Sequence, residues 1–474
     1  MIAPWAEEEV GAADLGDGRL DERLVVLLSA LGSRPNLSIP AACGGRAEME
    51  AAYRFFDNDK VTFDKVLGPH IDQTVRRLAD QDVALLVQDT TEVDLTRPEQ
   101  EVVGAGTLDG SRRGFLLHLL HAFTPQGVPL GTVGAEVVNR TGGVTGASTK
   151  KRSERAGTPI EAKESFRWLT GLRRARQVAE QLPRVSCVCV ADSEADIYEL
   201  FAEPRGESGL HWLIRACQDR AVADAPEHLR DQVLAVPVLF EVTLRVRARQ
   251  AKVARDERAR RQSRLGRSAT ATVRAAVVTL RPPWRADRQL PPVTVNAVLV
   301  SEVDPPTGEV PIEWLLLTTL PIDTVEQVRS IVAYYAVRWE IEVLFRTLKS
   351  GCRIERRRFE HMERVLPCLG LYLIVAWRTL FVCRLGQDEP ELSCEAIFEP
   401  SEWKAVWATV KRKPPPKRPP PLREVLHLVA GLGGYVKRPN SEPGAQTVWI
   451  GLQRTYDLAL AWDSFGPGSA RKGK

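Results

Sequence analysis

The chain has 474 residues, of which 44% are hydrophobic and 27% are charged. This length exceeds what one compact core holds, so we expect roughly two to four structural units, and the composition excludes disorder over most of the chain. The net charge of +4 does not by itself indicate a nucleic-acid partner, so the positions of the basic residues carry more information than their total.

The first 80 residues are predicted to be helical, because leucines recur at helical spacing from Leu20 to Leu28 and a further helix is indicated over Glu48–Phe56. The sequence Ser38-Ile-Pro marks a break between them. Apolar runs then predict strands over Val83–Val87, Phe115–Phe123, Gly131–Val138, Val185–Val190, His211–Ala216, Val238–Val246, Ala271–Leu280, Val293–Val300 and Trp314–Thr319.

Further helices are predicted over Phe166–Gln181, over Val325–Ser350 and after Pro367, with an interruption at the proline-rich residues 411–421. The polar residues 140–165 are predicted to form a mobile loop. His118 and His121 lie in an apolar segment and are predicted to be core histidines. Mixed strands with helices on both faces indicate an α/β core.

Two segments concentrate positive charge. Between Arg245 and Arg288 there are fourteen Arg or Lys residues and three acidic residues. A second run, with the sequence KRKPPPKR, covers residues 411–418. One such run is typical of a solvated loop, whereas two runs together favour a polyanionic partner.

The eight cysteines show neither a Cys-x-x-Cys motif nor paired Cys/His spacing, so they indicate neither a zinc site nor a disulfide framework. Cys187 and Cys189 alternate in an apolar run and are predicted to be small buried side chains. Residues 1–10 are acidic and do not resemble a signal peptide. The most apolar stretch, Leu369–Val382, is interrupted by Arg378 and is expected to be too short to span a bilayer. We therefore expect a cytoplasmic protein with no membrane partner.

Two aspartates follow buried apolar runs. Asp89 comes just after Val83–Val87, and Asp192 comes just after Val185–Val190. A carboxylate in that position projects from the edge of an open sheet, where ligands bind. Taken singly, each aspartate is equally typical of a turn or a helix cap.

The predicted helix Val325–Ser350 carries a stripe of polar residues. At about 100° per residue, its phenol, two cations and one acid fall within an arc of about 60°; they are Tyr335, Arg338, Glu342 and Lys349. The opposite side holds the apolar residues Ile341, Leu344 and Leu348. An exposed face with an Arg338–Glu342 pair would explain only part of this stripe.

A phosphoryl-transfer site would explain the whole stripe. Glu342 can hold a metal, Arg338 and Lys349 can neutralise phosphates, and Tyr335 can bind a phosphate or stack on a base. With Asp89 and Asp192 it completes a set of carboxylates that suits Mg²⁺ or Mn²⁺. Two such ions about 3.5–4 Å apart can activate one oxygen and stabilise another.

These residues also carry a family likeness. The pattern Tyr335-x2-Arg338-x3-Glu342-x6-Lys349 resembles the Tyr-Arg-Glu-Lys signature of the DDE transposases of insertion-sequence family four. Asp89-Thr-Thr and Asp192-Ser-Glu-Ala-Asp resemble the aspartate motifs of that family, and the chain is most similar to its transposon-five branch. The likeness runs from about Trp5 to Trp462 and includes Leu15–Asp17, Ala51–Phe55, Glu313–Leu317 and Gly451–Arg454.

The resemblance implies an α/β fold: an RNase H-like catalytic core with an inserted β-rich subdomain, and helical N-terminal and C-terminal domains. The expected divisions are a helical DNA-binding domain at 1–75, the core at 76–220 and 321–366, the β-rich insertion at 221–320 and a dimerisation domain at 367–474.

The resemblance also implies cut-and-paste transposition by two-metal phosphoryl transfer, with strand nicking, hairpin formation and opening, and strand transfer into target DNA. The implied cofactor is Mg²⁺, for which Mn²⁺ can substitute. The implied partners are double-stranded DNA at the transposon ends, target DNA and a second copy of the chain in the DNA complex, within the bacterial cytoplasm or nucleoid.

By the same resemblance, Asp89, Asp192 and Glu342 would be the catalytic metal ligands. The residues that would contact DNA are Tyr335, Arg338, Lys349, Trp314, Arg215 and Arg23, with Trp314 stacking on a flipped base. The family often has a basic residue at the position of Ser193.

Three other functions remain open at this point. A DDE nuclease would cleave DNA without joining it, and an assay for strand-transfer products would separate the two. A DNA-binding regulator with a degenerate core is disfavoured by the intact acid triad. A phosphatase of another fold would need neither the basic insertion nor two flanking domains.

Overall fold

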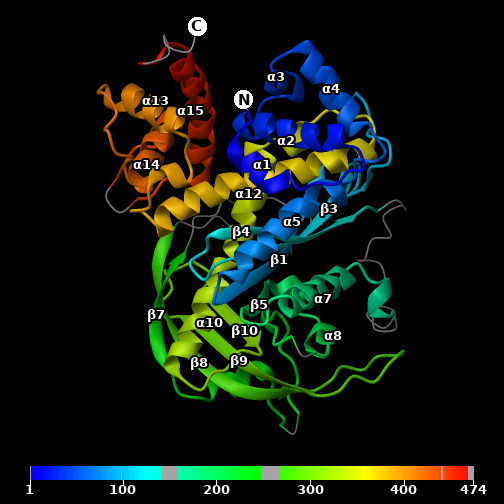
Figure 1. Ribbon diagram of the computed structural model, residues 1–474. Helices are drawn as coiled ribbons and strands as arrows, with labels where there is room; N and C mark the ends of the chain where they lie inside the picture. Colours follow the sequence, from blue (N-terminus) through cyan, green and yellow to red (C-terminus); the bar gives the residue numbers. More distant parts are fainter. Residues whose placement is uncertain are drawn as a thin grey trace. The chain divides into compact units, whose positions relative to one another are not determined.

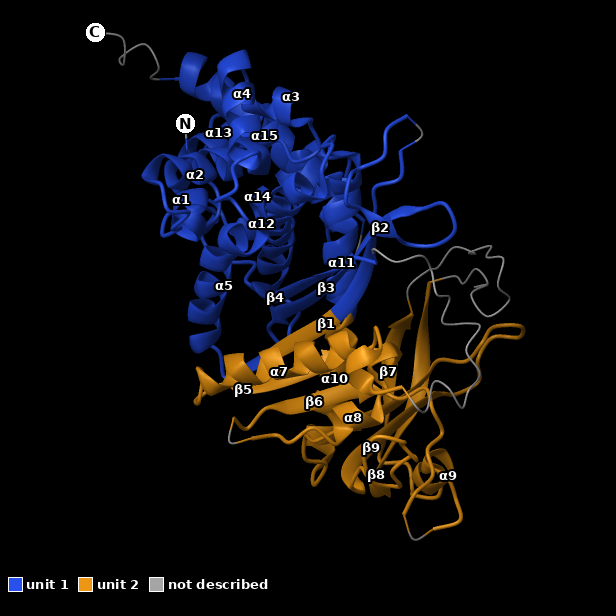
Figure 2. Ribbon diagram, turned by 90° about the vertical axis from the view of Figure 1, so that its right-hand side faces the viewer, with its two compact units in different colours: residues 1–84, 89–146, 339–474 blue, residues 85–88, 147–338 orange. Residues whose placement is uncertain are grey.

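The computed structural model describes residues 2–97, 99–140, 158–206, 208–223, 225–246, 266–438 and 441–467. The chain divides into two compact units, coloured separately in Figure 2. Unit 1 contains residues 1–84, 89–146 and 339–474, and unit 2 contains residues 85–88 and 147–338. Most of the expected mobile loop and the centre of the first basic run, at 141–157 and 247–265, lie outside the described residues.

Unit 1 begins with five helices, which confirms the prediction for the first 80 residues. They are α1 (Pro4–Val10), α2 (Gly18–Ser33), α3 (Ile39–Cys43), α4 (Arg46–Phe56) and α5 (Phe63–Ala79). The break at Ser38 is a helix start, because its hydroxyl accepts a hydrogen bond from the Ala41 amide and the following proline suits the first helical turn. Gly44, with φ of 77°, ends the same helix in a left-handed conformation.

The strands of unit 1 form a hairpin next to α5 (Figure 1). Strands β3 (Arg113–Phe123) and β4 (Pro129–Val138) pair antiparallel, as predicted, and the short β2 (Gly106–Thr107) pairs with β3. Strand β1 runs from Val83 to Asp94, so its residues 89–94 belong to unit 1 and 85–88 to unit 2. The prediction that Asp89 follows the strand is wrong. The β-branched residues after Asp89 continue the extended backbone, whereas Asp-Thr-Thr had suggested a turn.

The C-terminal part of unit 1 is helical. Its longer helices are α11 (Trp339–Arg346), α12 (Met362–Asp388), α13 (Pro400–Lys411), α14 (Leu422–Leu432) and α15 (Ala445–Phe465). Short turns of other helix types are η4 (Thr347–Gly351), η5 (Ile354–Arg356) and η6 (Cys394–Ala396).

Helix α12 is longer than predicted, because it starts at Met362 and includes Pro367. By length and composition it would suffice to cross a membrane, which corrects the expectation from sequence. However, 83% of its apolar window is buried inside the protein. The Trp377 indole donates to the Pro129 carbonyl at 2.9 Å, and Gly370 packs on Val66. Helix α12 therefore behaves as a core helix of unit 1.

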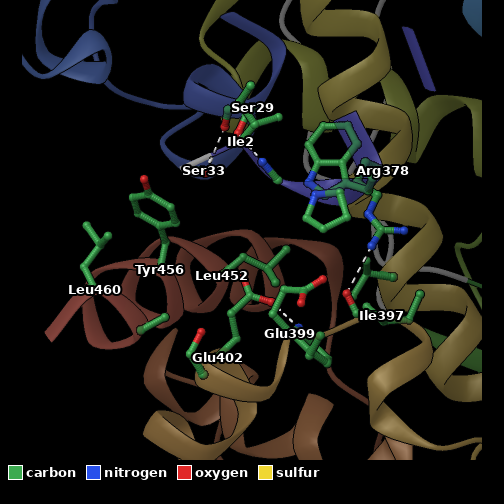
Figure 3. Close-up of a pocket in the computed structure, with 18 of the residues that line it drawn as sticks. Ile2, Ser29, Ser33, Arg378, Ile397, Glu399, Glu402, Leu452, Tyr456 and Leu460 are labelled. Atoms are coloured by element: carbon green, nitrogen blue, oxygen red, sulfur yellow. Dashed lines mark hydrogen bonds between the residues drawn. The ribbon is translucent and has the colours of Figure 1, made fainter. Parts of the chain in front are cut away.

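Arg378, the charge that interrupts this apolar helix, borders a cavity of about 120 Å³ in unit 1 (Figure 3). Its guanidinium donates to the Ile397 carbonyl at 3.2 Å and lies 5.6 Å from the Trp5 ring. Burial lowers the pKa of Arg378 to about 10, so the side chain is still charged at neutral pH. None of the predicted site residues lines this cavity.

A buried polar network joins α1, α5 and β4 of unit 1. Glu9 accepts from His70 Nδ1 at 2.5 Å and from both terminal nitrogens of Arg77 at 2.9 Å. His70 Nε2 accepts from the Thr132 amide at 3.0 Å, which requires a neutral ring with its proton on Nδ1. Burial would raise the pKa of Glu9, but the hydrogen bonds and charges of His70 and Arg77 bring that pKa below its ordinary value.

The predicted core histidines and cysteines are buried. Within unit 1, Nδ1 of His118 lies 2.8 Å from the Thr90 hydroxyl, and Nδ1 of His121 lies 3.0 Å from the Thr132 hydroxyl. Burial lowers the pKa of His121 well below its ordinary value, so its ring is neutral. Cys187 and Cys189 are fully buried in unit 2, as expected.

Unit 2 is built on a mixed sheet with the strand order β1-β5-β6-β10-β9-β8-β7 (Figure 1). Its strands beyond β1 are β5 (Ser186–Ala191), β6 (His211–Arg215), β7 (Phe240–Val246), β8 (Arg267–Leu280), β9 (Val293–Glu302) and β10 (Glu313–Thr318). Strands β5 and β6 are parallel. From β6 onward, the neighbours along the sheet, in the order β6-β10-β9-β8-β7, all pair antiparallel. All six lie within a few residues of their predicted bounds.

Among its described residues, unit 2 has the helices α7 (Phe166–Glu180), α8 (Tyr198–Phe201), α9 (Leu229–Leu234) and α10 (Val325–Val337), and the short 3-10 turns η1 (Ile160–Ala162) and η2 (Ser193–Ala195). Helix α10 opens with a capping box, in which Thr324 and Gln327 each bind the backbone amide of the other. These elements confirm a mixed α/β architecture.

Candidate active site

Asp192 lies directly after β5, as predicted from the apolar run before it. Its carboxylate accepts a hydrogen bond from the Glu194 amide at 2.8 Å and so caps the 3-10 turn η2. The side chain is half-buried. Asp192 therefore does cap a turn, as aspartates after strands often do. The same hydrogen bond fixes the position of its carboxylate.

Asp196, four residues later, anchors the segment that follows β6. This buried carboxylate accepts from the amides of Cys217 and Gln218, both at 2.8 Å, and forms an ion pair with Arg220. Sequence reasoning included Asp196 only as part of a motif. Its role was hidden because its partners are more than twenty positions away along the chain.

Arg215, at the end of β6, is held next to the Asp192 turn. Its guanidinium donates to the Ser193 hydroxyl at 3.0 Å. Ser193 is the position where the resembled family often has a basic residue. In this chain the Ser193 hydroxyl instead accepts a hydrogen bond from Arg215 of the neighbouring strand, so a positive charge still lies beside Asp192.

Tyr335 is buried at the end of α10, and its ring meets Trp314 edge-on at 5.1 Å. Its hydroxyl is buried and lies close enough to Arg338 for a hydrogen bond that lowers its pKa. The pKa of this hydroxyl is nevertheless raised, mainly by burial and also by the negative charge of Asp192. The positive charges of Arg215 and Arg338 partly offset this rise. Unit 2 thus gathers five predicted site residues: Asp192, Arg215, Trp314, Tyr335 and Arg338.

The predicted single helix Val325–Ser350 is interrupted, so that prediction is wrong in part. At Arg338, between α10 and α11, the backbone keeps helical dihedral angles (φ −46°, ψ −34°), but its amide donates to the Tyr335 carbonyl at 3.1 Å in place of the regular helical bond. Beyond α11 the chain forms the π-helix η4, closed by a bond from the Cys352 amide to the Thr347 carbonyl at 2.8 Å. Apolar periodicity does not record such changes in hydrogen bonding. The stripe computed for a regular helix therefore does not hold throughout.

Glu342 and Lys349 belong to unit 1. Glu342 lies on α11 and is half-buried, and the three apolar residues predicted to pack, Ile341, Leu344 and Leu348, are fully buried. Lys349 lies in the π-helix, where its ammonium is 3.6 Å from the Glu355 carboxylate. Glu355 also accepts from the amide of Asp94, the last residue of β1. Sequence reasoning missed Glu355, which links this turn to the strand that holds Asp89.

Arg23, on α2, is already engaged within unit 1. Its guanidinium is 2.5 Å from the Glu48 carboxylate of α4, and its side chain is 30% exposed. Both residues border a hollow of about 430 Å³. Binding of a phosphate by Arg23 would therefore have to compete with Glu48.

The carboxylates fit a hard divalent cation by their chemistry, since Mg²⁺ and Mn²⁺ prefer oxygen ligands. Asp89, Asp192 and Glu342 are each half-buried, and so they retain access to solvent. Among the described residues, no three or more His, Cys, Asp or Glu side chains are grouped as a metal site.

Comparison with known families finds three matches. A transposase DNA-binding model matches residues 2–61, a transposase DDE domain matches residues 170–376, and a transposase Tn5 dimerisation domain matches residues 374–460. The first match covers α1 to α4. The second includes Asp192 and Glu342 and begins after Asp89. The third covers most of α12 and the helices that follow it.

Proposed function

The chain belongs to the Tn5-like DDE transposases, and on that premise we propose that it moves DNA by a cut-and-paste mechanism. Membership makes it a metal-dependent enzyme of DNA transposition with an RNase H-like core. The observation that carries the proposal is the grouping in unit 2 of Asp192 with Arg215, Tyr335 and Trp314. The cations around this carboxylate can neutralise the phosphates of a bent DNA strand, and the aromatic rings can stack on its bases.

We assign the metal ligands to Asp89, Asp192 and Glu342, with Mg²⁺ as the cofactor and Mn²⁺ as a substitute. Bound divalent ions activate an attacking oxygen and stabilise a leaving one. Side chains of the protein would bind and orient the DNA phosphates. Arg215 and Arg338 neutralise phosphate charge, and the Tyr335 hydroxyl donates to a phosphate oxygen.

In this proposal water first opens a strand at the element end, and the freed 3′-OH attacks the opposite strand to give a hairpin. The hairpin is opened, and its 3′-OH attacks target DNA. Residues 1–75 bind DNA, 76–220 and 321–366 form the core, 221–320 form the β-rich insertion, and 367–474 pair subunits. Lys349 and Arg23 add DNA contacts, and the bacterial cytoplasm or nucleoid is the place of action.

The decisive experiment incubates the protein with Mg²⁺ and double-stranded DNA that carries the element ends, and separates the products on denaturing gels. Nicks, hairpins and joined strands are expected, and chelation of the metal should remove all three. Cleavage without joined products would identify a nuclease and contradict the proposal.

Trp314→Ala is expected to nick DNA normally but to form and open hairpins poorly. Trp314 is half-buried and contacts Tyr335 through its edge, so it is not a sealed core residue. Stacking on a flipped base is worth ~1–3 kcal/mol, which corresponds to a loss of roughly 5- to 150-fold in hairpin rate.

Trp314→Phe is the matched control, because it retains an aromatic face and should keep most hairpin activity. Single-turnover rates for nicking and hairpin formation are measured separately. Equal hairpin rates for the alanine variant and the unsubstituted protein, at equal thermal stability, would rule out the stacking role.

Two subunits are expected to hold two element ends through the C-terminal helices. The apolar helix α12 is mostly buried in its own unit, so it is not the favoured pairing surface. The dimerisation-domain match now carries the expectation. Two exposed apolar side chains on α15 are candidates for the interface: Leu460, the last residue of the matched stretch, and the more exposed Phe465, five residues beyond it.

Phe465→Asp is expected to shift the DNA complex from two subunits toward one, because a buried carboxylate in an apolar interface is costly. Light scattering of the complex with end DNA measures the change. Val277→Asp is the control, since Val277 is an exposed valine of β8 in unit 2. A transfer-competent complex of one subunit and one end would contradict the assembly.

A further inference from the structure

The connection between α13 and α14 is a concentrated positive surface. Residues 411–421, with the sequence KRKPPPKRPPP, are here called the basic proline loop. They hold five cations and no acid, and all five cations are exposed. Lys411 forms an ion pair with Glu424 at 3.0 Å. Within the described part of the chain the other four, Arg412, Lys413, Lys417 and Arg418, have no ion pair.

The backbone of the basic proline loop is anchored at both ends. At its start, Arg412 adopts a left-handed conformation with φ of 54°, which ends α13. At its end, the Pro420 carbonyl accepts from the Cys394 amide at 3.0 Å, and the Leu422 amide donates to the Leu392 carbonyl at 2.6 Å. Six prolines restrict the backbone between these points. The cations therefore stand on a preordered support, and binding would cost little backbone ordering.

We propose that the basic proline loop is a contact surface for the phosphate backbone of double-stranded DNA, independent of base sequence and additional to the active-site contacts. Clustered cations without acidic partners complement a polyanion. The loop has no aromatic residue to stack on bases, and proline has no amide hydrogen to donate. Such a surface positions DNA without reading it.

This inference rests on the DNA-transposing activity of the family, and it extends the role of the C-terminal region. The loop falls inside the stretch that matches the dimerisation domain. The region that pairs subunits would therefore also touch DNA, so that pairing and DNA binding strengthen each other. A loop of this kind favours duplexes of any sequence, such as target DNA or the DNA that flanks an element end.

The test replaces three exposed loop cations with glutamine in one variant: Lys413→Gln, Lys417→Gln and Arg418→Gln. None of these side chains has a partner within the described residues, so the fold should be unaffected. Binding to a duplex of arbitrary sequence is measured over a range of NaCl concentrations. Each lost phosphate contact lowers the slope of log K against log salt by about 0.9, so the slope should become shallower by roughly 2.7.

The matched control removes the same charge from three exposed arginines that lie outside both basic runs: Arg76→Gln, Arg184→Gln and Arg205→Gln. Its slope should stay close to that of the unsubstituted protein. Equal slopes for the loop variant and the control would overturn the proposal. So would a loop variant that loses binding to single-stranded RNA or to phosphatidylserine vesicles while duplex binding is unchanged.

A failure of the cut-and-paste proposal would give a different experimental result from a failure of the loop proposal. In that case the unsubstituted protein gives no joined products, yet the salt dependence still differs between the loop variant and the control. Conversely, a protein that transposes normally and shows no loop effect contradicts only the proposal for the loop. Thermal unfolding of each variant identifies any loss of fold.

Discussion

Replacing Glu342 with alanine is expected to abolish DNA cleavage while leaving DNA binding largely intact, and Asp192→Ala and Asp89→Ala should do the same. The carboxylates would act on the metal, whereas most of the binding energy comes from cations on the phosphate backbone. The several kcal/mol that metal ions supply to phosphoryl transfer corresponds to a loss of about a thousandfold or more in rate.

Single-turnover cleavage of end DNA measures this loss, and calorimetry with Mg²⁺ or Mn²⁺ shows whether each variant still binds the ion. Glu92→Ala is a matched control, because Glu92 lies on the same strand as Asp89 and pairs with Arg112 rather than with an expected metal. Its cleavage rate should stay near that of the unsubstituted protein. A triad variant that folds and cleaves at the normal rate would remove that residue from the metal site.

Sequence patterns located the elements well where one physical signal dominated. Continuous apolar runs predicted β5 and β10 to within a residue or two, because a buried strand needs apolar side chains on both faces. The signal was weaker where polar residues continue a strand, and so Asp89 was placed outside β1 although it lies within it. Helix α12 starts five residues before Pro367, whereas a proline in a helical pattern usually indicates a helix boundary.

The candidate site could be predicted as a set of residue types but not as a geometry. Asp192, Arg215 and Tyr335 were named from sequence, and the structure places these three near one another in unit 2. The supports were not visible, since Asp196 and Glu355 bind groups far along the chain. The interruption at Arg338 and the π-helix after α11 also leave no mark in the periodicity, because both preserve the apolar face while changing the hydrogen bonds.

The buried network around Glu9 should contribute strongly to the stability of unit 1. Glu9→Ala leaves the buried His70 Nδ1 without its acceptor and removes the ion pair of Arg77, which keeps its hydrogen bonds to the Leu130 carbonyl and the Thr74 hydroxyl. Breaking a buried pair in this way costs about 3–5 kcal/mol of unfolding free energy. Urea unfolding measures the loss. Glu7→Ala, an exposed glutamate on the same helix, is the control and should change the free energy by less than about 0.5 kcal/mol.

The same network predicts that acid destabilises unit 1. The pKa of His70 is lowered by burial, so as the pH falls through about 6.5 the unfolded chain binds a proton before the folded one does. The pKa of Glu9 is also lowered in the folded state, so its contribution is present above its unfolded value and is lost as the pH falls through the folded one. The His70 effect therefore lowers the unfolding free energy below about pH 6.5, and the Glu9 effect adds to it only below about pH 4.5. The urea midpoint of the unsubstituted protein should therefore drop more steeply over this range than that of the double variant Glu9→Gln, His70→Gln, which lacks both titrating groups. Parallel pH profiles for the two proteins would show that the network carries no proton linkage and that acid acts elsewhere.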